Sequence, residues 1–293
     1  MTTPLSELTT MRVGGTPAEL LEAHSRDQLI EFATGVWATG EDWLVLGGGS
    51  NIVAADDLSE LTVIRTLNRG IERDGTRLRV QAGENWDEFV AFTVDAGLTG
   101  VEALSGIPGC VGAAPVQNIG AYGQEVAETI TRLEFVEYPS GEISVLEASE
   151  LGFGYRDSIF KRGCQGVITW VEFELREGSP ASLDRLTQAI GREVSTSAEI
   201  RREVLATRAL KGMVLDDADR DTYSCGSFFT NPIVSEGFAL GIPSEAPRWL
   251  QEDGTVKLSA AWLIENSGLR KGFSLGTSKA AISSKDRKST RLN

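Results

Sequence analysis

Residues 44–57 read LVLGGGSNIVAADD, in which three consecutive glycines follow a short apolar run. A G-x-G-x-x-G dinucleotide fingerprint requires a third glycine where Ile52 stands and a helix after it, whereas the residues that follow lead to another strand. A Walker phosphate loop requires Gly-Lys-Ser/Thr, which this stretch lacks. Its glycine N–H groups, with Ser50 and Asn51 as further donors, can still hold a pyrophosphate. The alternative for the same residues is a tight turn between two strands.

A second stretch, residues 105–126, is also built from small residues and reads SGIPGCVGAAPVQNIGAYGQEV. Pro108 and Pro115 interrupt it, which indicates irregular backbone wrapped closely around a flat or phosphorylated molecule. Its glycines are Gly106, Gly109, Gly112, Gly120 and Gly123, and its hydrogen-bonding side chains include Gln117, Asn118 and Tyr122. An irregular core loop would explain one such stretch, but two in one half of the chain favour a large cofactor.

The 293 residues carry 28 basic and 42 acidic side chains, a formal net charge of −14. A negative field of that size disfavours nucleic acid and anionic membrane as partners. No apolar stretch approaches the roughly 20 residues of a membrane span. The N-terminal residues lack the basic flank and apolar core of a signal peptide. The composition therefore predicts a globular, cytoplasmic protein that binds neither nucleic acid nor membrane.

Histidine and cysteine are scarce in this sequence. His24 is the single histidine, so Ser-His-Asp or Cys-His catalysis and His-ligated metal sites have little support. Cys110, Cys164 and Cys225 form no C-x-x-C pair, which argues against a zinc site or a disulfide framework. Cys225 is expected to be a small buried hydrophobe. We predict no metal, so the chemistry must rely on other acids or on a bound cofactor.

The periodicity predicts an α+β protein of two domains. Strands are expected within 43–49, 61–67, 77–83 and 166–177, and a hairpin over 131–148. Residues 84–98 predict a helix that buries Trp86, Phe89, Val90, Thr93 and Val94. Residues 180–209 have charged, helical spacing that would join two units, and 258–269 predict an amphipathic helix. We place the domain boundary near residue 185.

Six motifs resemble the UDP-N-acetylenolpyruvoylglucosamine reductase family, in that family's order. They are TMRVGG (10–15), LGGGSN (46–51), the stretch 105–125, FGYRDSIFK (153–161), GSFFTNP (226–232) and AAWLIENSGLRKG (260–272). The glycine stretch and GYRDSIFK are specific to the family, whereas GGGSN is shared with other flavin enzymes of the same fold. The resemblance covers residues from about 8 to about 285.

The resemblance implies a flavin-binding domain of the vanillyl-alcohol-oxidase kind over 1–185, followed by a smaller substrate-binding domain over 186–285. It implies an FAD-dependent reduction, with NADPH as hydride donor, of UDP-N-acetylglucosamine enolpyruvate to UDP-N-acetylmuramate, a peptidoglycan precursor, by a monomer. The residues expected to bind FAD are Gly47, Gly48, Gly49, Ser50, Asn51, Gly109, Gly112, Gln117, Asn118, Gly120, Ala121 and Tyr122.

Two residues match the family's catalytic positions. Arg156 would hold the substrate carboxylate bidentately as negative charge develops on it, and Ser227 would donate the proton to C2. Without the resemblance, the Arg-Asp pair would indicate a surface ion pair, and Gly-Ser before two phenylalanines would indicate a turn. The resemblance further implies that Lys211 binds the substrate's phosphates, that Asn231 contacts the sugar nucleotide and that Tyr155 shapes the pocket.

The chain departs from the family pattern at two places. Leu183 stands where family members commonly have a tyrosine that contacts the substrate. We therefore expect weaker substrate binding at this position. After residue 285 the pattern stops, and DRKSTRLN (286–293) is expected to be a non-native tail on a truncated substrate domain. No residue matches the family's C-terminal catalytic glutamate. The alternatives are therefore a flavin-binding remnant with little activity, or another flavin-dependent dehydrogenase of this fold that acts on 2-hydroxy acids.

Overall fold

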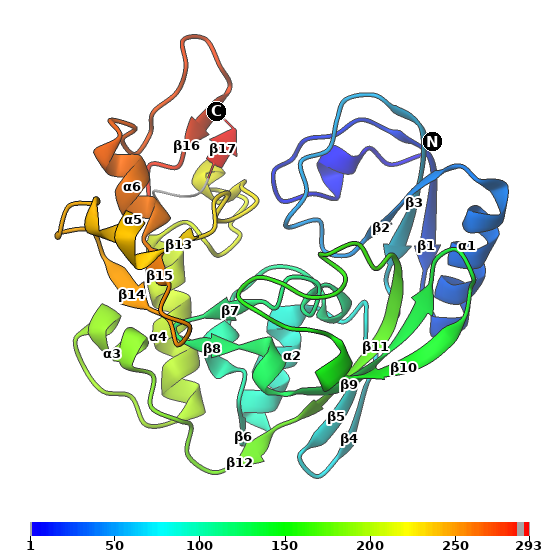
Figure 1. The fold of residues 1–293 in the computed structure, drawn as a ribbon. Helices are drawn as coiled ribbons and strands as arrows, with labels where there is room; N and C mark the ends of the chain where they lie inside the picture. The colour runs from blue at the N-terminus through cyan, green and yellow to red at the C-terminus, as the bar shows by residue number, and fades with distance from the viewer. Residues whose placement is uncertain (1, 286–289, 293) are drawn as a thin grey trace. The chain divides into compact units, whose positions relative to one another are not determined.

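The computed structural model describes residues 2–285 and 290–292, the last three by their backbone alone. Its chain divides into two compact units between Ala209 and Leu210. Each unit combines helices with sheets, which confirms the α+β class (Figure 1). In the part of the chain that is described, no helix is both long and apolar enough for a membrane span.

The first sheet of the N-terminal unit is parallel and has the strand order β1-β3-β2. Its strands are β1 (Pro17–Ala23), β2 (Asp42–Leu46) and β3 (Leu58–Thr66), and helix α1 (Arg26–Thr39) joins β1 to β2. Ser25 begins this helix by accepting a hydrogen bond from the Gln28 N–H at 3.1 Å, and Gly40 ends it at φ +73°. Because parallel strands end at the same edge, the glycine turn after β2 lies at the carboxyl edge of this sheet.

The second sheet is antiparallel and has the order β10-β9-β11-β5-β4. Its strands are β4 (Ile71–Asp74), β5 (Arg77–Gln81), β9 (Ile130–Glu137), β10 (Ile143–Glu147) and β11 (Gly166–Glu174). Strands β9 and β10 form the hairpin expected over 131–148. Helix α1 packs between the two sheets, because its buried residues share one apolar cluster with residues of β1, β3, β9 and β11 (Figure 1).

Helix α2 (Trp86–Asp95) supplies the largest side chains of the main core. Asn85 caps it by accepting hydrogen bonds from the N–H groups of Asp87 and Glu88 at 2.9 and 3.1 Å. Four of the five residues predicted to face inward are buried, and the fifth, Val94, is partly buried. The rings of Phe89 and Phe173 lie 4.8 Å apart at the centre of this core.

Short elements complete the N-terminal unit. They are the 3-10 helices η1 (Leu5–Glu7), η2 (Glu102–Leu104), η3 (Val111–Ala113), η4 (Val126–Glu128) and η5 (Ala148–Glu150), the strand pairs β6 (Leu98–Thr99) with β12 (Arg176–Glu177) and β7 (Gly120–Ala121) with β8 (Gln124–Glu125), and the helices α3 (Asp184–Ile190) and α4 (Ser197–Leu210). The compact units divide later than residue 185 because Leu186, Ile200 and Val204 share an apolar cluster with Ala103. A functional boundary near 185 stays a prediction.

The C-terminal unit is built around a small antiparallel sheet of order β13-β15-β14. Its elements are η6 (Arg220–Thr222), β13 (Ile233–Val234), α5 (Glu236–Leu240), β14 (Arg248–Leu250), β15 (Val256–Leu258), α6 (Ala260–Asn266), β16 (Ala280–Ile282) and β17 (Thr290–Leu292). Ala239, Val256 and Leu258 form its apolar centre. Most of the segment predicted to be a non-native tail, residues 286–289 and 293, lies outside the described residues.

An ion pair joins α1 to the second sheet. Arg26 Nε and Nη2 donate to the two carboxylate oxygens of Glu134 on β9 at 2.6 and 3.0 Å, and Thr169 Oγ1 donates to the same carboxylate at 2.5 Å. Burial alone would raise the pKa of Glu134, but the hydrogen bonds from Arg26 and Thr169 hold that pKa below its ordinary value. A carboxyl whose pKa is lowered on folding stabilises the fold above its unfolded-state pKa.

We expect Glu134→Gln to lower the free energy of unfolding at pH 7 by about 1–3 kcal/mol, because it leaves Arg26 without its charged partner. The difference from wild type should be constant down to about pH 5 and should narrow as the pH falls below the ordinary carboxyl pKa of about 4.3. Urea denaturation across this pH range measures it. Glu137→Gln, an exposed position on the same strand, is the control. A difference that already narrows at pH 6 would contradict this assignment.

Candidate functional site

The glycines that follow β2 lie in direct backbone contact with other parts of the N-terminal unit. A Cβ atom on Gly48 would lie 2.6 Å from the Cα atom of Gly109, and one on Gly47 would lie 2.5 Å from the sulfur of Cys110. Gly49 has φ +61°, and a Cβ atom there would lie 2.0 Å from the carbonyl oxygen of Leu8. Only glycine permits the backbone contacts at Gly48 and Gly49, and a side chain on Gly47 would displace the Cys110 sulfur.

The two glycine-rich stretches predicted from the sequence lie against each other. Ser50 Oγ donates a hydrogen bond to the carbonyl of Pro108 at 3.0 Å, and Asn51 Nδ2 donates to Gln117 Oε1 at 3.4 Å. Gly112 is held in turn against β5, since its N–H donates to the Ala82 carbonyl at 2.8 Å. The structure therefore brings residues 47–51 and 108–117 together. The two hydrogen-bonded pairs are 58 and 66 positions apart in the chain.

The hydrogen-bond donors of the turn fit a phosphate group. Among the described residues, the N–H groups of Gly49, Ser50 and Asn51 have no backbone acceptor. Gly48 and Asn51 are exposed. A turn at the carboxyl edge of a parallel sheet that presents successive N–H groups can bind phosphate oxygens without a basic side chain. The donor set and the close backbone approach thus suit a pyrophosphate.

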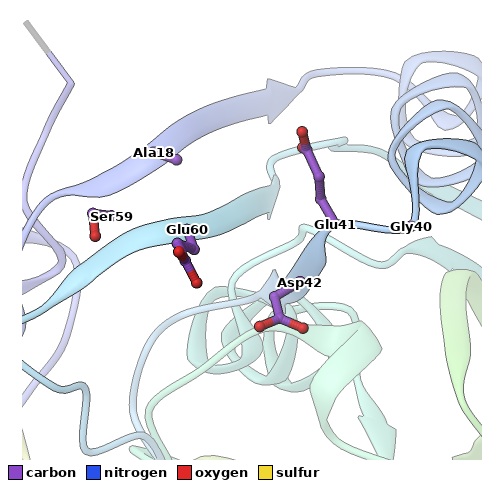
Figure 2. A pocket seen from close by; sticks show the side chains of 6 residues that line it. All are labelled: Ala18, Gly40, Glu41, Asp42, Ser59 and Glu60. Carbon is purple, nitrogen blue, oxygen red and sulfur yellow. The ribbon is translucent and has the colours of Figure 1, made fainter.

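The opposite edge of the same sheet is acidic. Figure 2 shows an open pocket lined by Ala18, Gly40, Glu41, Asp42, Ser59 and Glu60, at the amino ends of β2 and β3. Its three carboxylates would repel a phosphate. In the described ranges, no group of three or more His, Cys, Asp or Glu side chains is arranged to hold a metal ion. The carboxyl edge is therefore the one that suits an anionic cofactor.

The side chain of Arg156 contacts the second glycine stretch. Its Nη1 atom donates to the carbonyl of Asn118 at 2.9 Å, and its Nη2 atom donates to the carbonyl of Gly120. The Glu125 carboxylate lies 3.6 Å from Nη1, and the guanidinium carbon lies 5.3 Å from the centre of the Tyr155 ring. Arg156 adopts φ +55°, a conformation that is unfavourable for a non-glycine residue and is often found at functional sites.

The side chain of Asn118 forms hydrogen bonds within the protein. The residue is buried, and its side chain donates to Glu125 Oε2 at 2.8 Å and to the Gly154 carbonyl at 3.0 Å. Its Oδ1 atom accepts a hydrogen bond from the Ala127 N–H at 3.0 Å. The side chain thereby joins the glycine stretch to the loop that carries Arg156. Glu125 has no expected role in the sequence, although it closes the family motif and contacts both Asn118 and Arg156.

Strands β7 and β8 form a hairpin that carries three predicted cofactor residues. Gly120 and Ala121 belong to β7, and Tyr122 follows at the turn with φ +53°. A Cβ atom on Gly120 would lie 2.9 Å from the Gln124 carbonyl oxygen and 2.8 Å from Arg156 Nη1, so glycine fits best there. Tyr122 packs against the apolar cluster of α3 and α4. Burial raises the pKa of its hydroxyl, against the lowering effect of the Arg208 charge, so it is protonated at neutral pH.

The remaining predicted residues lie in the C-terminal unit. Ser227 is exposed and precedes Phe228 and Phe229, whose rings lie 5.2 Å apart and are each 55% exposed. Asn231 Oδ1 accepts a hydrogen bond from the Ala260 N–H at 3.1 Å and so helps begin α6. Lys211 is exposed directly after α4. Cys225 is only partly buried, so its expected burial is wrong: it lies outside any helix or strand, two residues before the exposed Ser227.

Comparisons with known proteins agree with this division of the chain. Residues 17–147 match the FAD binding domain model, and residues 218–288 match the model of the UDP-N-acetylenolpyruvoylglucosamine reductase C-terminal domain. The UDP-N-acetylenolpyruvoylglucosamine reductase of Leifsonia xyli subsp. xyli (strain CTCB07) is 52% identical over 333 residues, an alignment that covers 97% of this chain and 88% of that protein. The protein of the same name from Mycolicibacterium gilvum (strain PYR-GCK) is 44% identical over 96% of this chain and 82% of its own length.

The structural comparison leads to the same family. The crystal structure of UDP-N-acetylenolpyruvylglucosamine reductase from Thermus caldophilus superimposes with a TM-score of 0.68 at 29% identity, covering 99% of this chain and 86% of that one. The fold prediction, an FAD-binding domain followed by a smaller reductase domain, is thereby confirmed. The chain belongs to the UDP-N-acetylenolpyruvoylglucosamine reductase family.

Proposed function

We propose that this chain catalyses the FAD-dependent reduction of UDP-N-acetylglucosamine enolpyruvate to UDP-N-acetylmuramate, with NADPH as hydride donor, in the cytoplasmic synthesis of peptidoglycan precursors. The observation that carries the proposal is the guanidinium of Arg156, which lies on the glycine stretch within hydrogen-bond distance of Asn118 and Gly120. Family membership supplies the reaction class.

The FAD site in this proposal is the carboxyl edge of the first sheet. Residues 47–51 would hold the pyrophosphate through their N–H groups, with Gly109, Gly112 and Gln117 beside them. Gly120, Ala121 and Tyr122 would line the site further along the same stretch. Asn118 would act by holding the stretch in place, since its side chain is already bonded within the protein. When bound there, the flavin would supply hydride transfer between NADPH and the enolpyruvyl double bond.

Arg156 would bind the substrate carboxylate. Hydride addition at C3 leaves negative charge that spreads from C2 onto this carboxylate, so a cation held beside it favours the transition state over the ground state. A guanidinium has five N–H donors. Two of its nitrogens already donate to the carbonyls of Asn118 and Gly120, which orient the planar group. The remaining donors would serve the substrate, with Tyr155 packed on the guanidinium face.

Ser227 would protonate C2. A serine hydroxyl is a weak acid, but an enolate held at contact distance is basic enough to take its proton. Its exposed position leaves the hydroxyl accessible to a bound substrate. Lys211 would bind the diphosphate, and Asn231 would contact the sugar nucleotide while it holds the start of α6.

The test is NADPH oxidation by the FAD-loaded protein. The proposal requires oxidation that depends on the enolpyruvyl sugar nucleotide and yields a product two hydrogens heavier. Protein that binds FAD but shows no such turnover would instead be a flavin-binding protein without this activity. Flavin that is bleached by lactate in the absence of NADPH would indicate a 2-hydroxy-acid dehydrogenase.

Gly48→Ala should weaken FAD binding by about tenfold or more, because the added methyl group overlaps Gly109 Cα and forces the two glycine stretches apart. Quenching of flavin fluorescence on titration with apoprotein measures the dissociation constant. Gly35→Ala is the control, since a Cβ atom on Gly35 in helix α1 meets no atom within 4 Å. Equal FAD affinity of Gly48→Ala and wild type would exclude the turn as the pyrophosphate site.

Arg156→Lys should lower kcat by about 10²–10³-fold and leave FAD affinity unchanged, because a lysine keeps the charge but loses the planar fork. Steady-state kinetics at saturating FAD and NADPH provide the measurement. Arg162→Lys changes a more exposed arginine of the same loop that pairs with Asp157 and should retain activity. Wild-type kcat in Arg156→Lys would remove Arg156 from the mechanism.

Ser227→Ala should reduce turnover by about 10²–10⁴-fold, because protonation of C2 loses its donor. Bleaching of the flavin absorbance by NADPH in a stopped-flow experiment should remain normal, since no proton is delivered to C2 in that half-reaction. Ser244→Ala, another exposed serine of the C-terminal unit, is the matched control. Loss of both half-reactions in Ser227→Ala would point to a general defect and would contradict the assignment.

A further inference from the structure

The start of helix α2 holds the backbone of residues 106–110, which lies against the glycine turn. The Asp87 carboxylate accepts a hydrogen bond from the Gly106 N–H at 2.6 Å, and the Trp86 N–H donates to the Gly109 carbonyl at 3.1 Å. Asn85 and Cys110 form an isolated antiparallel bridge. Three successive residues of one helix start therefore contact the backbone between Gly106 and Cys110. Asp87 is the one that does so through its side chain.

The Gly106 contact holds a left-handed glycine in place, beside the backbone hydrogen bonds that join Ile107 to Leu104 and Gly109 to Trp86. Gly106 is buried with φ +70° in the left-handed region. Pro108, two residues later, lacks an N–H and offers its carbonyl to Ser50 of the glycine turn at 3.0 Å. A shift at Gly106 would move Pro108 and Gly109, the residues against which Ser50 and Gly48 lie. The carboxylate of Asp87 is thus two residues from a contact with the proposed pyrophosphate turn.

Arg201 on helix α4 keeps this carboxylate charged and oriented. Its Nη1 and Nη2 atoms lie 2.6 and 2.8 Å from Oδ1 and Oδ2 of Asp87, a bidentate pair in which the side chains are 19% and 34% exposed. Burial would raise the pKa of Asp87, but the hydrogen bonds from Arg201 and the Gly106 N–H lower it. The acceptor for Gly106 is therefore an ionised carboxylate at neutral pH, which accepts more strongly than a neutral oxygen.

We propose that Asp87 is a positioning residue for the flavin: its carboxylate holds the Gly106 N–H so that Pro108 and Gly109 meet the glycine turn in the geometry that binds the pyrophosphate. The inference rests on the proposed FAD site. Asp87 and Arg201 touch no cofactor themselves in this scheme, and they act through the backbone of residues 106–109.

Fluorescence titration of apoprotein with FAD, together with thermal unfolding, tests the inference. Asp87→Ala removes the acceptor and the ion pair, and the FAD dissociation constant should rise about tenfold or more. Asp87→Asn keeps an oxygen for Gly106 but loses the charge, and Arg201→Gln keeps the carboxylate but loses its partner. Both should bind FAD within about threefold of wild type, although both lose thermal stability. At saturating FAD, the kcat of all three should be near the wild-type value.

Glu88→Ala is the matched control. Glu88 also lies in the first turn of α2, so its removal costs the same helix-dipole interaction, but its contact is with Arg69 on the surface. This variant should bind FAD as wild type does. If Asp87→Ala is not recovered folded, Asp87→Leu fills a similar volume without an acceptor and must show the same loss of affinity.

Two results would overturn the inference while the proposed function stands. The first is wild-type FAD affinity in Asp87→Ala. The second is an equal loss of affinity in Asp87→Ala, Asp87→Asn and Arg201→Gln, because affinity would then follow the stability of the ion pair and not the acceptor at Gly106. A wild-type apoprotein that binds no FAD would remove the proposed function, and this inference with it.

Discussion

The close approach of two backbones, at Gly48 and Gly109, is the constraint on which the site depends. No side chain larger than hydrogen fits at Gly48 while the Gly109 Cα atom stays where it is. Because its three glycines carry no side chains, the N–H groups of the turn can approach a ligand closely. It also joins the parallel sheet to the stretch that carries the carbonyls contacted by Arg156. One steric requirement thus couples the proposed cofactor site to the proposed catalytic group.

The charge of the protein makes such local donors necessary. With a net charge of −14, the chain as a whole repels the ligands of the proposed function, FAD, NADPH and a nucleotide sugar, all of which are anionic. The open pocket at the amino edge of the first sheet is an example, since carboxylates line it. Backbone N–H groups provide an attraction that does not depend on net charge. They also act at short range, where screening by salt is weak.

The sequence predicted those features that depend on local pattern. The apolar spacing of α2 and the hairpin of β9 and β10 were predictable because each element repeats its own period. The two glycine stretches were recognisable from composition. The contacts of Asp87 with Arg201, 114 positions apart, and of Arg156 with Asn118 were not, because nothing local distinguishes such residues from solvated ones. The division between Ala209 and Leu210 depends on packing of α3 and α4 that periodicity does not reveal.

Asn118 and Asn231 illustrate a more general point about polar side chains near a site. Both belong to recognisable motifs, and both direct an oxygen to a backbone N–H within the protein, at Ala127 and at Ala260. Leaving a buried N–H without an acceptor costs more free energy than one hydrogen bond to a ligand contributes. Such a residue therefore stabilises the loop before it contacts a ligand. Glycine restricts the backbone less than any other residue, so a glycine-rich stretch needs hydrogen bonds from its backbone and from polar side chains around it to define one conformation. The family motif combines both requirements: glycines that allow the approach, and asparagine and acidic side chains that hold it.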